Sequence, residues 1–160
     1  MLRLALFEPR MVTTSPAVLL KPRLDVSMDV AERLARDFFA RVWAPPHDLD
    51  AIDELMTIDY RITTAGHVVE GRSAFKAWVG EMQKVVREAT NEHLEIFTSA
   101  AGDRVVSRWI TRGYNNGMFG LEADQQRIEF SGIAIWRIEH GRLAECWVER
   151  AAHELFQRLR

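Results

Sequence analysis

The chain has 160 residues, of which 48% are hydrophobic and 28% are charged. This length suits one domain, because single domains cluster at about 100–150 residues. The 21 basic and 23 acidic residues give a net charge of −2, so there is no basic excess for a phosphate backbone, which argues against nucleic-acid binding. No uncharged apolar run approaches the roughly 18 residues of a membrane span, and no membrane partner is expected.

Cys146 is the single cysteine of the chain. One thiol cannot form an internal disulfide, so the composition favours a reducing compartment, and we expect a cytoplasmic protein. The five histidines are scattered without the spacing of metal ligands, and no glycine loop has the form that cradles a phosphate. The sequence therefore predicts neither a metal nor another cofactor.

Residues 1–27 have neither a helical nor a strand period, and Pro16 and Pro22 interrupt them. We predict a disordered tail here or, alternatively, an arm that crosses onto a partner subunit. Met28 opens a sequence typical of a domain start, so an upstream choice of start is a further explanation of the extra residues. The folded domain is expected over residues 28–160.

Two helices are predicted before residue 60. The first begins at Asp29 and Glu32, which have capping-box spacing, and ends before Pro45. Its apolar residues recur every four positions and are Val30, Leu34, Phe38 and Val42. A shorter helix follows Asp48 or Asp50.

After a short strand over residues 60–64 and a turn at Gly66, a third helix is predicted to begin at Ser73, with an apolar stripe from Phe75 to Val86. The second half of the chain then changes period. Residues 93–100, 104–114, 128–139 and 143–150 are rich in Val, Ile, Trp and Phe and predict long antiparallel strands, and residues 152–159 predict a last helix. Helices followed by a strand meander indicate an α+β fold, with the helices on one face of a curved sheet.

Three segments carry a family resemblance: GDRVVSRWITRGYNNGMFG at 102–120, FSGIAIWRIEHGRLAECWVE at 130–149 and HELFQRL at 153–159. In residue sequence and in order along the chain they resemble the SnoaL-like polyketide and ester cyclases of the nuclear-transport-factor-2-like superfamily. The resemblance implies a cone-shaped α+β roll of the cystatin-like barrel type. Three N-terminal helices would pack on a strongly curved mixed, mostly antiparallel sheet. It also implies a homodimer formed through the sheet face.

Two positions depart from the family pattern. The histidine of the family's G-T-H-x-G segment falls on Asn115, and its catalytic aspartate falls on Ala151. The family's acid is thus missing at the aligned place. Another residue has taken its role, the chemistry has changed, or catalysis has been lost.

The His140–Gly141 turn sets a register for the last hairpin. If these two residues form the loop, Glu139 opposes Arg142 and Gly132 opposes Glu149. One face then carries Phe130, Gly132, Ala134, Trp136, Glu145, Trp147 and Glu149, and we expect this face to line the cone. The small residues Gly132 and Ala134 would leave room there for a ligand.

We hypothesise that Glu149 is the replacement acid/base, because an aromatic, dehydrated cavity raises a carboxyl pKa toward the useful range. Asn115 would orient a substrate oxygen. The alternative is that Glu149 is a strand-end carboxylate paired with Arg127 or Arg150. The remaining candidates would bind substrate, and they are Tyr60, Trp109, Phe130, Trp136 and Trp147. For the tryptophans, core packing beneath the helices is the alternative.

Three functions follow from these residues. The first is a cofactor-independent cyclase, isomerase or dehydratase that acts on a small hydrophobic substrate bearing a carbonyl or hydroxyl group. The second is a binding protein that has lost the family's acid, with Ala151 in its place. The third is an interaction module whose cone is filled by Trp109 and Trp147.

Overall fold

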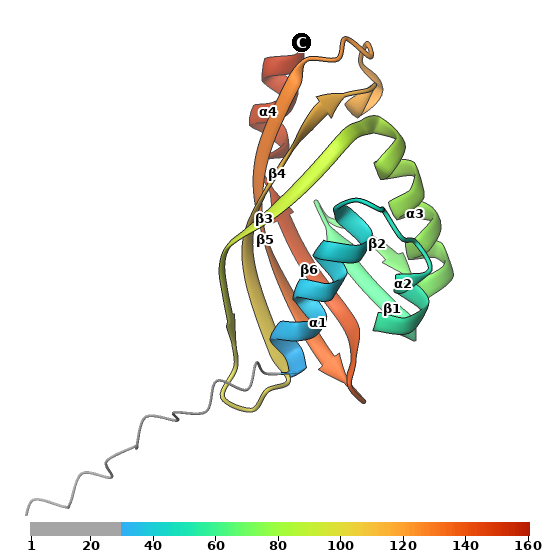
Figure 1. The fold of residues 1–160 in the computed structure, drawn as a ribbon, viewed down its shortest axis with the longest axis vertical. Helices are drawn as coiled ribbons and strands as arrows, with labels where there is room; N and C mark the ends of the chain where they lie inside the picture. The colour runs from blue at the N-terminus through green and yellow to red at the C-terminus, as the bar shows by residue number, and fades with distance from the viewer. Residues whose placement is uncertain (1–29) are drawn as a thin grey trace, which may run out of the picture.

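A computed structural model describes residues 30–160 as helices packed on one side of a curved sheet (Figure 1). The predicted tail or arm at residues 1–27, and the cap at Asp29, lie outside these residues. None of the helices described is long and apolar enough to cross a membrane.

The helical elements are α1 (Val30–Phe38), the π-helical turn η1 (Phe39–Trp43), α2 (Ala51–Leu55), α3 (Arg72–Val85), the 3-10 turn η2 (Met118–Gly120) and α4 (Ala152–Leu159). The strands are β1 (Met56–Thr64), β2 (His67–Glu70), β3 (Val86–Thr98), β4 (Arg104–Asn115), β5 (Arg127–Glu139) and β6 (Arg142–Arg150). The hairpin strand β2 was not predicted, and β3 begins within the stripe assigned to the third helix.

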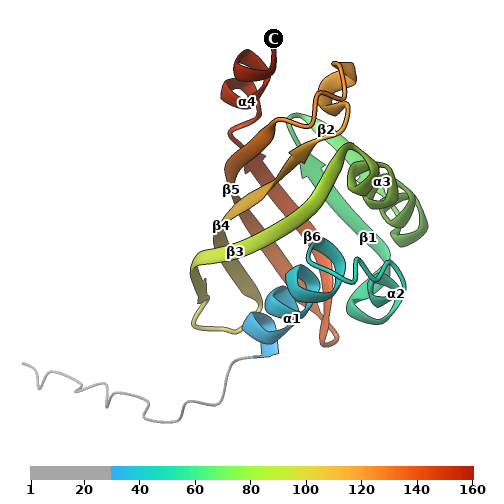
Figure 2. The ribbon, with the colours of Figure 1, turned by 45° about the horizontal axis from the view of Figure 1, so that its top comes forward.

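The strand order is β2-β1-β6-β5-β4-β3, with β1 and β6 parallel and the other neighbours antiparallel. The predicted α+β class and the mixed, mostly antiparallel sheet are confirmed. The sheet is curved but not closed, because β2 and β3 remain its two edges. Figure 2 shows α1, α2 and α3 on the concave side, while α4 lies at the far end of the sheet.

The first helix changes geometry where it meets the sheet. Helix α1 buries Ala31, Leu34 and Ala35, whereas Val30, predicted at the start of the buried stripe, is 46% exposed. The wider turn η1 then brings both Phe38 and Phe39 onto the sheet, where their rings lie 6.3 and 5.8 Å from that of Trp136. These contacts form the centre of the core.

A β-bulge in β6 reverses the predicted facing of its last residues. Glu139 does pair with Arg142, as predicted from the two-residue turn, and Ile138 pairs with Leu143. The next pair is Arg137 with Glu145, so Ala144 has no partner of its own. From there on every pairing moves by one residue, and alternation in a strand has a period of two.

The bulge places Cys146, Val148 and Arg150 on the concave side of the sheet, and Trp147 and Glu149 on the convex side. The sequence-based register after Ala144 was therefore wrong by one residue. On β5 the predicted facing is right: Gly132, Ala134 and Trp136 are buried.

Candidate functional site

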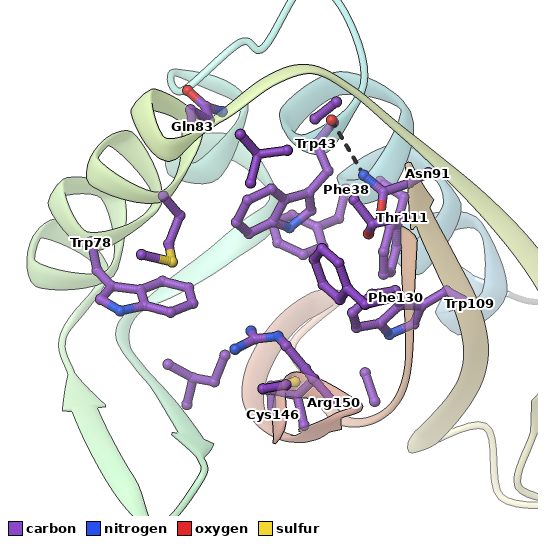
Figure 3. A pocket seen from close by; sticks show the side chains of 18 of the residues that line it. Phe38, Trp43, Trp78, Gln83, Asn91, Trp109, Thr111, Phe130, Cys146 and Arg150 are labelled. Carbon is purple, nitrogen blue, oxygen red and sulfur yellow. Dashed lines mark hydrogen bonds between the residues drawn. The ribbon is translucent and has the colours of Figure 1, made fainter. Parts of the chain in front are cut away.

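A cavity of about 150 Å³ lies between the helices and the concave side of the sheet (Figure 3). We call it the aromatic cavity, since ten of its lining residues are Phe38, Phe39, Trp43, Tyr60, Phe75, Trp78, Trp109, Phe119, Phe130 and Trp136. Aliphatic residues, methionines, the Cys146 side chain, Gln83, Asn91, Thr111 and Arg150 complete the lining. A largely apolar wall with a few polar groups is typical of a small-molecule site.

Several polar side chains of the wall make hydrogen bonds to other residues of the protein. Gln83 Nε2 donates to the Val42 carbonyl at 2.8 Å. Asn91 Nδ2 donates to the Trp43 carbonyl at 3.3 Å (Figure 3), and Asn91 Oδ1 accepts from Thr111. These bonds fasten η1 to α3 and β3, and so they hold the three side chains in place on the wall.

Three other polar atoms of the wall, Tyr60 Oη, Trp109 Nε1 and Trp136 Nε1, are fully buried. Hydrogen bonding with the Cys146 thiol and the Trp136 indole affects the pKa of Tyr60, so these three side chains lie together at the wall. Trp109 Nε1 has no hydrogen-bond partner among residues 30–160, whereas buried polar groups are normally paired. Burial raises the pKa of Tyr60 well above its usual value and that of Cys146 to about 12, so both groups are neutral at pH 7.

Arg150 is the charged residue of the wall. Its Nη1 donates to Thr64 Oγ1 at 2.9 Å, and its guanidinium carbon lies 5.4 Å from the centre of the Trp78 ring. Figure 3 shows the side chain extending from β6 toward Trp78. None of the lining residues in the described part of the chain is Asp, Glu, His or Lys.

The expectation that Glu149 faces the cone is wrong. The bulge at Ala144 turns its exposed side chain to the convex side, and its neighbour Arg150 faces the cavity instead. Trp147, predicted as a binding residue, is 39% exposed on the same convex side. The cone is thus not filled by Trp147, as an interaction module would require.

Asn115 is fully buried, but its side chain holds a loop and does not line the cavity. Its Nδ2 donates to the Glu122 carbonyl and to Asp124 Oδ1, both at 2.8 Å. Its Oδ1 accepts from the backbone N–H groups of Gly117 and Met118 at 3.1 and 2.9 Å. With all these bonds made inside residues 115–124, the amide is not available to orient a substrate oxygen.

The structure places the other predicted binding residues, Tyr60, Trp109, Phe130 and Trp136, on the wall of the aromatic cavity. Their contact with a substrate stays a prediction. Gly132 leaves no room for a ligand, because the Trp109 indole occupies the space above it. Ala151, at the position of the family's acid, precedes α4 and is not part of the wall.

Sequence reasoning missed Arg150, Cys146 and Trp78 as parts of the wall. Trp78 belongs to the predicted apolar stripe of the third helix, and its ring lies 5.8 Å from that of Phe75 while it also lines the cavity. Arg150 and Cys146 were placed on the opposite face by the wrong register. Within the described residues no cluster of three or more His, Cys, Asp or Glu side chains is arranged to hold a metal.

Comparison with known proteins gives one family and many solved structures. The SnoaL-like domain model matches residues 35–146. No curated protein matches the sequence significantly.

A structure from Jannaschia sp. CCS1, assigned as a SnoaL-like polyketide cyclase, superposes with a TM-score of 0.75 at 16% identity, covering 84% of this chain and 96% of that one. The protein IdmH from Streptomyces antibioticus, assigned as a polyketide cyclase, gives 0.70 at 17% identity over 81% and 97%. A protein of ketosteroid isomerase-like fold from Catenulispora acidiphila, solved with trimethylamine, gives 0.65 at 11% identity over 79% and 91%. At these identities the likeness shows the shared fold.

Proposed function

Because the chain belongs to the SnoaL-like domain family, we propose that it binds a small, largely apolar molecule in the aromatic cavity and cyclises, isomerises or dehydrates it. The family and the fold suggest cyclase- or isomerase-type activity, since similar structures are assigned as polyketide cyclases. The observation that carries the proposal is the cavity itself, whose aromatic wall contains the buried polar atoms Tyr60 Oη, Trp109 Nε1 and Trp136 Nε1. The substrate would present a carbonyl or hydroxyl oxygen to them.

Tyr60 is the residue best suited to act on that oxygen. Its hydroxyl is fully buried beside the Cys146 thiol and the Trp136 indole, and burial keeps it protonated. A neutral phenol can donate a hydrogen bond to a carbonyl oxygen and stabilise the negative charge of an enolate, which is strongest in a dehydrated site. The indole N–H groups of Trp109 and Trp136 are further donors.

The wall offers no carboxylate as a base, so the proposed substrate is one whose carbon acid ionises readily, such as a 1,3-dicarbonyl compound. Stabilising its enolate lowers the pKa of the carbon acid, and the aromatic wall holds the chain folded for ring closure. The α-proton passes to solvent water, since the wall supplies no base, and the step needs no cofactor. The single buried thiol fits the cytoplasmic location expected from composition.

A binding protein without catalysis is the second candidate. It is favoured by the lack of an acidic lining residue in the described chain and by Ala151 at the position of the family's acid. The two candidates agree on ligand binding and differ only in turnover.

The test uses benzoylacetone, a 1,3-dicarbonyl probe, with binding measured by calorimetry and exchange of its α-protons with D₂O measured by NMR. The proposed enzyme binds the probe and accelerates exchange beyond an equal concentration of denatured protein. Tyr60→Phe lowers the exchange rate at least tenfold and leaves the dissociation constant within a few-fold. Tyr114→Phe changes the other tyrosine of the chain, which is exposed on β4, and serves as the matched control. Binding without exchange identifies the binding protein, and absence of binding overturns both candidates.

A further inference from the structure

Arg150 is the part of the cavity wall that the proposed function leaves without a role. Its contacts are the neutral hydroxyl of Thr64 and the face of Trp78. No carboxylate of residues 30–160 lies within 4.0 Å of its nitrogens, whereas Arg112 and Arg137, on the convex side, each bind two.

This arrangement leaves a cation unneutralised in apolar surroundings. A guanidinium carries five N–H donors in a planar fork, and Thr64 accepts from one nitrogen. Burial lowers the pKa of Arg150, as expected for a cation removed from water. The Trp78 ring attracts the charge but accepts no in-plane hydrogen bond. The site is therefore complementary to an anion with two oxygens that can lie in the plane of the fork.

We propose that the aromatic cavity takes hydrophobic carboxylic acids, and that Arg150 binds their carboxylate between Thr64 and Trp78. The apolar body of the acid then lies against the aromatic wall. This inference rests on the proposed function and names its substrate class. It makes Arg150 the residue that distinguishes acids from neutral molecules of the same shape.

The test compares benzoate, cinnamate and 2-naphthoate with their primary amides by calorimetry at pH 7.5. Each pair shares its apolar body, so the difference in affinity reports the charge. We expect at least one acid to bind the wild-type protein on the order of tenfold more tightly than its amide. Arg150→Met should bind the amide as before and lose the preference for the acid. Arg108→Met is the matched control: it removes an arginine that pairs with Glu95 on the convex side, and this variant should keep the preference for the acid.

Each outcome decides one of the two proposals. Equal binding of acid and amide by the wild-type protein overturns the role of Arg150 and leaves the proposed function standing. A preference that persists in Arg150→Met also overturns it, because another group then binds the carboxylate. If no probe of either kind binds, the proposed function fails and this inference fails with it. Should Arg150→Met not fold, Arg150→Gln, which retains a donor for Thr64, gives the same comparison.

Discussion

The indole of Trp109 lies over Gly132, its partner across β4 and β5, so closely that a methyl group on Gly132 would overlap the ring. The backbone carbonyl of Glu149 closes the same space, at 2.7 Å from that methyl position. Glycine is therefore required here by the position of the indole.

Replacing Gly132 by alanine should destabilise the fold by about 1–3 kcal/mol, because an overpacked core must move a side chain or the backbone. Urea denaturation followed by far-UV circular dichroism measures the free energy of unfolding. Gly80→Ala is the control: in α3 a new methyl group would meet only Leu49 at 3.5 Å, and alanine favours helix, so stability should hold or rise. Equal effects of the two substitutions would contradict the packing described.

Asn115→Ala should destabilise the loop of residues 116–126, because it removes hydrogen bonds to four groups around one buried amide. We expect a loss of about 2–4 kcal/mol and faster amide hydrogen exchange in this loop. Asn116→Ala, which removes exposed bonds to the Lys84 carbonyl and from Gln125 Nε2, should cost less. If Asn115→Ala left exchange unchanged while abolishing probe binding, the earlier hypothesis of a substrate-orienting amide would return.

Glu149→Gln should leave probe affinity within about twofold, since the carboxylate is exposed on the convex side of the sheet. Its neighbours Val148 and Arg150 line the cavity, but Glu149 does not. Calorimetry with 2-naphthamide measures this directly. A tenfold loss would mean that β6 is registered as the sequence first indicated, without the bulge.

Protein stability should fall at high pH through Cys146. Its pKa is raised by burial to about 12 in the folded chain, from an ordinary value of about 9. The stabilisation is complete below pH 9, and it is lost as pH rises from 9 toward 12, by up to about 1.4 kcal/mol for each pH unit.

Urea denaturation of the wild-type protein and of Cys146→Ala between pH 8 and 11 checks this, because the variant lacks the thiol's contribution to the pH dependence of the free energy of unfolding. The thiol is the only one in the chain, so its alkylation rate gives an independent measurement. Native protein should react slowly with iodoacetamide at pH 8 and fast only in urea. Rapid native reaction would show that Cys146 is accessible.

We propose that the convex sheet face forms the homodimer expected from the family resemblance. Ile133, Ile135 and Trp147 are 49%, 40% and 39% exposed there, side by side on β5 and β6. Ion pairs of Arg108, Arg112 and Arg137 surround them. A charge in the middle of an apolar interface is costly, so Ile133→Glu should give a monomer in sedimentation equilibrium. Val30→Glu, on the helical side, should not change the mass, and a monomeric wild-type protein would contradict the proposal.

Most of the order of elements follows from hydrophobic period, although the short strand β2 was not predicted. The apolar stripe around Phe38 and Phe75, and the alternation from Arg104 to Asn115, predict α1, α3 and β4 correctly because each periodicity is long and uninterrupted. Element ends were less predictable. Val86 belongs to a strand although it continues the helical stripe, because pairing with Asn115 decides its conformation.

The site was predictable on β4 and β5 and not on β6. Trp109 and Trp136 sit on strands that alternate regularly, so their facing could be inferred from period two. The bulge at Ala144 could not be predicted from the sequence, because a bulge of this type does not require glycine or proline at the extra position. Because of the extra residue Ala144, Arg150 faces the cavity and the predicted acid Glu149 does not.

That alanine decides which residues of β6 face the cavity. Deleting it would turn Trp147 and Glu149 inward and Cys146, Val148 and Arg150 outward, converting a cation-lined cavity into an acid-lined one without any substitution. In enzyme design on this scaffold, the length of the last hairpin therefore sets the charge of the cavity wall independently of the choice of side chains.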